Sequence, residues 1–474
     1  YCPDIGRILY TDGSVFLRSK EYIDGKIELN GVVKAAVLYL PENSSTLRSM
    51  EVVVPFTCRS ELKDAGECVF LVQGRLQEAE ARLLNPRKLL LRVNVLEEVA
   101  AYSIQKVELI EEITAEEEMG LQQKNEDVST DIIKTIKEKD FTFMDEICLP
   151  SNKEEIEEIL SCCYELQAAE SKVLGEKVVI NGQIYCRLLY RSVSGQLCSW
   201  EGELPLHQVV DVEKGKDDSQ VQINLQVIGC EQELSGEGSG RCVTVNLFIK
   251  AQLVLWENCS LQYVADTYST RYNTSVQRQP LMLMHQQPQQ SKRQNVHELL
   301  EIGIQPKQVA AVRVYCTPVH CVKDTCVLNM QTTVHISVVY LDENSVPLAA
   351  QRQIEVHSAA EVSHDSSCTA RALCQGEIYA APSNGGVDVR FSIDFMVQET
   401  VCQTATALQE VQLKDPTNFA GIPSVILRSR EGSESLWEIA KRYSSTEEAI
   451  RQANELETEE ISQGQLLLIP RCRC

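Results

Sequence analysis

Alternating apolar and polar residues fill most of the chain, and the pattern returns at a fixed distance. Three such stretches end in a tyrosine: Tyr39, Tyr190 and Tyr340. A short triplet follows each tyrosine and recurs every 150 residues, with the central residues Pro55, Pro205 and Glu355. Period-two alternation rich in β-branched residues is typical of β-strands, and self-similarity at a fixed offset indicates copies of one unit. The sequence therefore predicts three β-rich repeats.

Each repeat is predicted to be a mainly antiparallel β-sandwich or barrel-like unit. Turn-forming residues separate the predicted strands at 85–87, 235–238 and 383–386. Short amphipathic helices are expected before the second and third sheets, at about Lys153–Glu165 and Lys292–Glu301, and residues 131–139 have helical tendency. The start of the first repeat, at Asp4, is expected to follow a segment like those that precede the other two repeats.

The repeats and the composition between them predict the following domain boundaries. Residues 1–113, 147–269 and 293–415 form the repeats, the first of them incomplete at its N-terminus. Residues 114–146 form an acidic linker and residues 270–292 a Gln-rich linker. Residues 420–474 form a different, smaller domain with a cysteine-containing tail.

The last fifty residues have a strand–helix–helix–strand pattern. Ser435 is placed to cap a helix over LWEIAKRY, and Ser445 or Thr446 to cap a second helix. This stretch resembles the LysM module in Ser435-Leu436-Trp437, in the Ala453-Asn454 pair and in the final Gly464–Pro470 segment. The resemblance implies a βααβ fold and binding of glycans that contain N-acetylglucosamine, or of a protein. It also implies a groove between two loops, with the candidate residues Ser433, Glu434, Ser435, Asn454, Gln463 and Gly464.

The large repeats resemble SPOCS domains, a family named for the spore coat. The resemblance rests on the Asn30-Gly31 and Asn181-Gly182 strand starts, the strands that end in Leu-Tyr, and the triplets around Pro55 and Pro205. The third repeat departs from this pattern at Gln331-Thr332 and at Glu355. Together with the LysM module, these features resemble clostridial spore morphogenesis and coat assembly proteins. The resemblance implies a spore coat morphogenetic protein as partner.

Composition narrows the classes of function. The formal net charge is −23 and 43% of the 474 residues are hydrophobic. No basic stripe is present to neutralise phosphates, so nucleic acid is not an expected partner. No run of eighteen apolar residues occurs, so no membrane span is expected. No repeated catalytic cluster, phosphate-binding loop or paired zinc knuckle is found, so the sequence predicts a protein without enzymatic activity, metal or cofactor.

Cysteine is the most unusual component. The chain has 19 cysteines, and they do not recur at repeat positions, as a disulfide framework shared by the repeats would. Candidates for inter-chain cross-links are Cys2, the adjacent pair Cys162 and Cys163, and the tail residues Cys472 and Cys474. The arginines beside the tail cysteines favour the reactive thiolate. The other interpretation is that these cysteines are reduced thiols, in the core or at the surface.

These observations predict a structural assembly protein of the bacterial spore envelope, deposited from the mother-cell cytoplasm. Its repeats would self-associate, and its LysM module would recruit a coat protein or peptidoglycan. One alternative is a self-polymerising filament or surface layer outside the cell. The other is a peptidoglycan-binding targeting subunit.

Overall fold

The structure is a computed structural model, and it describes residues 3–62, 68–213, 215–235, 240–429, 434–456, 462 and 464–471, without the side chains of residues 168, 169 and 375. The chain forms two compact units. The first unit contains Tyr1–Ile104, Ile132–Glu257 and Gln286–Val401. The second contains Gln105–Asp131, Asn258–His285 and Cys402–Cys474. None of the described helices is long and apolar enough to span a membrane.

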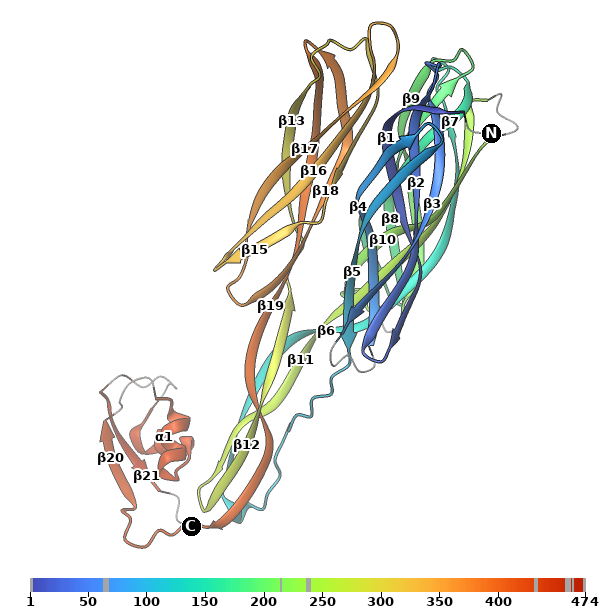
Figure 1. The fold of residues 1–474 in the computed structure, drawn as a ribbon. Coiled ribbons are helices and arrows are strands. Elements are labelled where there is room, and N and C mark those ends of the chain that lie inside the picture. Colours follow the sequence, from blue (N-terminus) through green and yellow to red (C-terminus); the bar gives the residue numbers. More distant parts are fainter. Residues whose placement is uncertain are drawn as a thin grey trace. The chain divides into compact units, whose positions relative to one another are not determined.

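Each repeat in the first unit has an antiparallel meander as one of its two sheets (Figure 1). Repeat 1 forms it from β1 (Ile5–Ile23), β2 (Lys26–Pro41) and β3 (Arg48–Glu61). Repeat 2 uses β7 (Ile156–Leu174), β8 (Lys177–Ser192) and β9 (Leu197–Asp211). Repeat 3 uses β14 (Gln308–Cys316), β15 (His320–Asp324), β16 (Val327–Leu341) and β17 (Pro347–Glu361). The three repeated tyrosines lie in the central strands and are buried, which explains the recurrence of this position.

The second sheet of each repeat is built on a hairpin. These hairpins are β4 (Cys68–Asn85) with β5 (Lys88–Ser103), β10 (Gln220–Leu234) with β11 (Cys242–Ser269), and β18 (Ser366–Ser383) with β19 (Gly386–Pro416). In repeat 2 a third strand, β6 (Leu121–Cys148), pairs with β11. In repeat 3, β13 (Gln290–Glu301) pairs with β19 in the same way. The prediction of mainly antiparallel, two-layered β units is confirmed, and the sheets are open.

The prediction of short helices before the second and third sheets is wrong. The segment around Lys153–Glu165 lies mostly in β7, and Lys292–Glu301 lies in β13. The helical tendency of residues 131–139 is also overridden, because these residues belong to β6. In each case a long neighbouring strand offers a continuous ladder; β13, for example, is paired with β19 along its whole length. Pairing and burial then outweigh local propensity. β6 and β12 (Tyr272–Gln286) also run through much of the two segments predicted to be linkers.

The second unit contains the distal parts of β6, β11 and β19 together with β12, the short helix η1 (Glu117–Met119) and the C-terminal module. The module consists of β20 (Val425–Ser429), α1 (Leu436–Tyr443), α2 (Glu447–Asn454) and β21 (Leu466–Pro470). β20 and β21 pair antiparallel in a two-stranded sheet. The predicted βααβ order is therefore confirmed.

Candidate functional site

The first helix of the C-terminal module begins at a complete capping box. The side chain of Ser435 accepts a hydrogen bond from the Glu438 backbone N–H at 3.2 Å, and the Glu438 carboxylate accepts one from the Ser435 N–H at 2.8 Å. Two backbone donors that a helix start leaves unsatisfied are thus paired. The Ser435 hydroxyl, a candidate groove residue, therefore has a role in starting α1.

Asn454, another candidate groove residue, ties α2 to β21. Its side-chain amide donates to the backbone carbonyls of Ile450 and Leu468, each at 2.7 Å. Its side-chain oxygen accepts from the Leu468 N–H, also at 2.7 Å. Because Asn454 bonds both backbone groups of one β21 residue, it fixes the position of the last strand beneath the helices.

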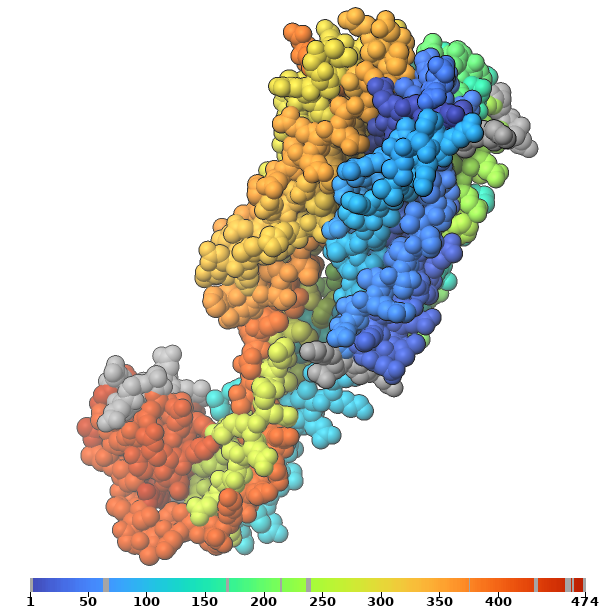
Figure 2. Space-filling model, in the orientation of Figure 1, coloured from blue at the N-terminus to red at the C-terminus, as the bar shows by residue number. Residues whose placement is uncertain are grey.

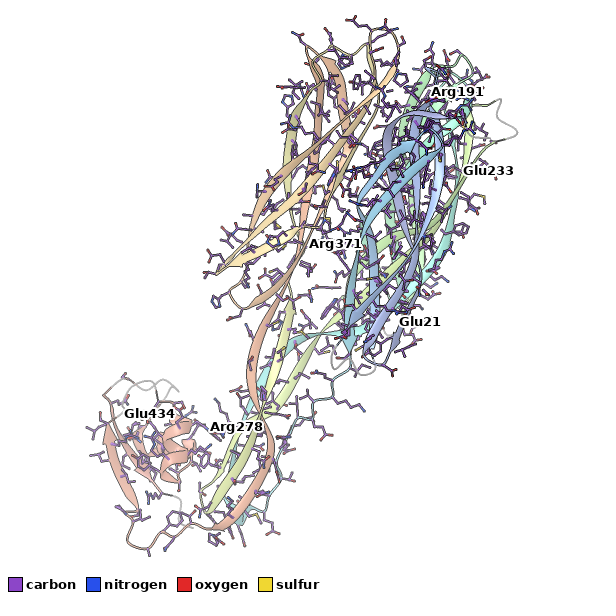
Figure 3. All side chains as sticks on the ribbon, in the orientation of Figure 1. Glu21, Arg191, Glu233, Arg278, Arg371 and Glu434 are labelled. Atoms are coloured by element: carbon purple, nitrogen blue, oxygen red, sulfur yellow. A yellow bond between two sulfur atoms is a disulfide. The ribbon has the colours of Figure 1, made fainter. Side chains whose placement is uncertain are left out.

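Glu434 lies between two cations of the module. Its carboxylate is 3.1 Å from a guanidinium nitrogen of Arg428 in β20 and 2.6 Å from one of Arg442 in α1. The Arg428 guanidinium also lies 5.6 Å from the ring centre of Tyr443, within the range of a cation–π contact. Glu434, labelled in Figure 3, therefore joins the first strand of the module to its first helix.

The module packs against β11 through an aromatic pair. The rings of Tyr268 in β11 and Trp437 in α1 meet edge to face, with 4.8 Å between their centres. The Tyr268 hydroxyl donates to the Ser445 carbonyl at 2.9 Å. Both rings belong to one core cluster with Leu436, Ile450 and Ile469, among others. Edge-to-face aromatic pairs add to the energy of burial, so this contact fixes the module on the strand.

Asp266 of β11 is the polar centre of the same contact. It accepts from the Trp437 indole N–H at 2.8 Å and from the Lys441 ammonium at 2.6 Å. Arg278 of β12, labelled in Figure 3, donates to it at 2.7 Å. Burial would raise the pKa of Asp266, but the hydrogen bonds from Lys441 and Trp437 and the neighbouring positive charges outweigh burial and lower it.

The structure describes four of the six candidate groove residues. Glu434, Ser435 and Asn454 make contacts within the module, and Gly464 has a positive φ of 79°, which favours glycine. Ser433 and Gln463 lie outside the described residues. Sequence reasoning missed Asp266 and Tyr268, because nothing in their local sequence indicates that a module more than 150 residues away packs on them.

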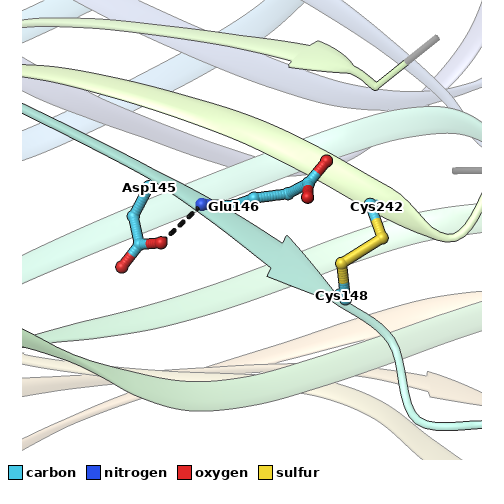
Figure 4. Close-up of a disulfide and its surroundings, with 4 residues drawn as sticks. All are labelled: Asp145, Glu146, Cys148 and Cys242. Carbon is cyan, nitrogen blue, oxygen red and sulfur yellow. Dashed lines mark hydrogen bonds between the residues drawn. A yellow bond between two sulfur atoms is a disulfide. The ribbon is translucent and has the colours of Figure 1, made fainter. Parts of the chain in front are cut away.

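The structure contains a disulfide that the sequence did not indicate, between Cys148 at the end of β6 and Cys242 at the start of β11 (Figure 4). The two cysteines are 94 residues apart, and their Cα atoms lie 4.2 Å apart across the ladder. Glu146 has a carboxylate near the two sulfur atoms. Because the sulfurs are bonded to each other, this group does not form a metal site.

The adjacent cysteines Cys162 and Cys163 lie in β7, one on each face of the strand. Cys162 packs against the core of repeat 2. Cys163 donates to the Asp12 carboxylate at 3.4 Å and accepts from the Arg313 guanidinium at 2.9 Å. Burial raises the pKa of each thiol to about 12, so the reactive thiolate is scarce at neutral pH. Cys2, Cys472 and Cys474 lie outside the described residues, and a role of any of the five in cross-linking stays a prediction.

Family models bear out both resemblances. The model described as SipL, SPOCS domain matches residues 4–83 and 155–234, in the first two repeats. The LysM domain model matches residues 433–470. Neither a curated protein nor a solved structure gives a significant match. The chain therefore contains two SPOCS domains and one C-terminal LysM domain.

This combination of domains fits a spore-associated protein that binds peptidoglycan. SPOCS and LysM are binding and structural domains rather than catalytic ones. The LysM match includes Glu434, Ser435, Asn454 and Gly464 and also Ser433 and Gln463.

Proposed function

We propose that this protein is a structural assembly component of the bacterial spore envelope. Its β repeats associate with one another between molecules, and its LysM module recruits a coat morphogenetic protein or the glycan of peptidoglycan. The observation that carries the proposal is the presence of SPOCS and LysM matches in one chain. A net charge of −23 further favours basic or cation-bridged partners over anionic surfaces.

The fixed position of the LysM module supports a recruiting role. Asp266 and Tyr268 hold one side of α1 against β11. A module held in this way presents its remaining surface in one orientation, and a pre-organised site loses less entropy when it binds. The predicted groove between the first strand–helix loop and the second helix–strand loop remains the proposed contact surface.

Glycan recognition is tested by sedimentation of the purified chain with insoluble peptidoglycan. We expect the chain to sediment and to be released by soluble N-acetylglucosamine oligomers. Cellulose oligomers of the same length, which lack the N-acetyl group, are the matched control and should not release it. Sedimentation that neither oligomer reduces would contradict recognition of the glycan by the module. A purified coat morphogenetic protein would then be tested in its place.

Self-association is tested separately, by light scattering over a range of protein concentrations and by negative-stain electron microscopy. We expect regular assemblies that grow with concentration. Repeating the measurement with reductant asks whether cysteine cross-links hold the assemblies together. A chain that stays monomeric at every concentration, with and without reductant, would refute assembly through the repeats.

A further inference from the structure

A polar cleft lies between repeats 1 and 3, within the first compact unit. Its volume is about 440 Å³, inside the range of roughly 300–1,000 Å³ that is typical of small-molecule sites. One wall comes from β1 and β4 of repeat 1, and the other from β14, β16 and β17 of repeat 3. Figure 2 shows the blue atoms of repeat 1 side by side with the yellow and orange atoms of repeat 3. The cleft is therefore large enough for a small ligand.

The wall from repeat 3 is the polar face of its meander. Cross-strand partners in an antiparallel sheet share a face, and so do residues two positions apart in one strand. The side chains on this face are Tyr315, His335 and Gln353 in one row and Ser337 and Gln351 in the next. Val334 and Val338 of β16 belong to the core of repeat 3 on the opposite face. The sheet therefore turns hydroxyl, amide and aromatic groups toward repeat 1.

Tyr10 of β1 supplies a buried hydroxyl without a partner. The residue is 8% exposed and lines the cleft, and its hydroxyl has no hydrogen-bond partner among the described residues. Burial raises the pKa of Tyr10, so the hydroxyl keeps its proton at neutral pH and can donate. Because an unpaired buried polar group is costly, we expect this hydroxyl to serve a ligand that enters the cleft.

Other polar groups in the cleft are also free to bond a ligand. The Tyr315 and Ser337 hydroxyls and the Gln351 amide make no hydrogen bond to another described residue. One carboxylate oxygen of Glu78 accepts from Asn94 at 3.0 Å, which leaves the other oxygen available. Hydroxyl and amide groups both donate and accept, whereas a carboxylate only accepts. The cleft therefore offers donors and acceptors to the same ligand.

The basic groups that line the cleft are paired or uncharged. Arg352 lies 3.5 Å from the Glu298 carboxylate. Burial lowers the pKa of His335, so its imidazole is uncharged at neutral pH. Among the described residues of the lining, no unpaired cation is left to bind an anionic ligand, and polar walls do not suit an apolar one. A neutral ligand with many hydroxyl groups fits this lining best.

The rings of Tyr315 and His335 add an apolar surface to the cleft. They stack with 4.6 Å between their centres and 9° between their planes. The Gln353 amide nitrogen lies 3.2 Å from Nδ1 of His335, so the neutral ring accepts there and carries its proton on Nε2. Aromatic rings beside a few polar groups are usual in small-molecule sites. The C–H groups of a sugar ring can pack on such a surface.

We propose that the cleft between repeats 1 and 3 binds a neutral sugar of one or two hexose units. The sugar hydroxyls accept from Tyr10, donate to Glu78 and exchange hydrogen bonds with Gln351, while the ring packs beside Tyr315. The site belongs to the repeats alone. It rests neither on glycan recognition by the LysM module nor on a role in the spore envelope.

The probes are glucose, maltose and cellobiose, which lack the N-acetyl group expected of a LysM ligand. Each is added to the full chain, with binding followed by saturation-transfer NMR and stabilisation by thermal unfolding. We expect at least one of them to bind at a single site and to raise the unfolding temperature. Spermidine and inorganic phosphate are the charged controls and should not displace the sugar.

Tyr10→Phe separates a ligand-binding role from a structural one. Without sugar, the variant should be at least as stable as the original chain, because only an unpaired hydroxyl is lost. Its affinity for the sugar should fall about two- to ten-fold, the range expected of one neutral hydrogen bond. Gln351→Leu, at an exposed position, should weaken binding to a similar extent. Tyr379→Phe, at an exposed tyrosine of repeat 3 that does not line the cleft, is the matched control and should change neither property.

Three results would overturn the proposal. The first is that none of the three sugars binds. The second is that spermidine or phosphate displaces the bound sugar, which would indicate a site for a charged ligand. The third is sugar binding that Tyr10→Phe and Gln351→Leu both leave unchanged, which would place the sugar elsewhere on the chain.

Discussion

Arg313 of β14 forms an ion pair with Asp12 of β1, and the thiol of Cys163 in β7 bonds to both. These residues occupy the same position in the three repeats, because their cross-strand partners in the central strands are Ala36, Arg187 and Ser337. The residues two positions earlier, Tyr10, Ser161 and Ala311, line a cavity beside the three side chains. The equivalent position thus holds an acid in repeat 1, a thiol in repeat 2 and a base in repeat 3, and contacts among these three side chains join the repeats.

This junction should be sensitive to the loss of one partner. Arg313→Met leaves the Asp12 carboxylate buried without its cation, so we expect a loss of about 3 kcal/mol in unfolding free energy. The double variant Asp12→Leu with Arg313→Met removes both charges and should recover most of that loss. Chemical unfolding at pH 7 measures both. Equal destabilisation by the single and double variants would show that the ion pair itself does not matter.

Asp266 should make attachment of the LysM module depend on pH. Its pKa is lowered because the Lys441 and Trp437 hydrogen bonds outweigh burial. A lowered carboxyl pKa stabilises the native contact above the ordinary value of 3.8, and this stability is lost as the pH falls through the folded-state pKa. The protection of α1 amides, measured relative to their intrinsic exchange rate at each pH, should therefore fall on acidification. Asp266→Asn should show fast exchange already at pH 7, whereas the exposed control Asp218→Asn should not.

Glu97 should make the stability of repeat 1 depend on pH in the opposite direction from Asp266, with stability lost as the pH rises. Burial raises its pKa to about 7, so the folded chain holds a proton that the unfolded chain releases. Stability is fully present below the ordinary pKa of 4.5 and declines as the pH rises through about 7. Solvent screening at this partly exposed site limits the decline to about 1–2 kcal/mol. Glu97→Gln should flatten it and Glu98→Gln should not; a titration of Glu97 near 4.5 would contradict the prediction.

The Cys148–Cys242 disulfide should stabilise repeat 2. Replacing both cysteines with alanine removes a cross-link that closes a loop of 94 residues, and we expect a loss of about 2–4 kcal/mol. Reductant should lower the unfolding midpoint of the original chain to that of the double variant. The exposed Cys58→Ala is the matched control and should respond to reductant as the original chain does. If reductant lowered the unfolding midpoint of the double variant by the same amount, the stabilising disulfide would be one other than Cys148–Cys242.

Much of the fold could be predicted from the pattern of residues. The strands around Tyr39, Tyr190 and Tyr340 were found because a strand with one buried face alternates with period two. The helix starts in the LysM module were found because Ser435 and Thr446 carry local capping chemistry. β7 and β13 were mistaken in part for helices, because amphipathic residues in short segments fit both periods until a neighbouring strand pairs with them.

The sequence by itself determined the three repeats, their strand-rich character, the βααβ module and the kind of domain to which the first two repeats and the module belong. These features depend on local periodicity and short motifs, which are formed by residues close together in the sequence. Only the tertiary structure decided that Asp12, Cys163 and Arg313 meet, that Asp266 anchors Trp437 and that Cys148 bonds to Cys242. Each of these depends on which distant strands become neighbours, and that is settled by the burial and hydrogen bonding of the whole chain rather than by any local segment.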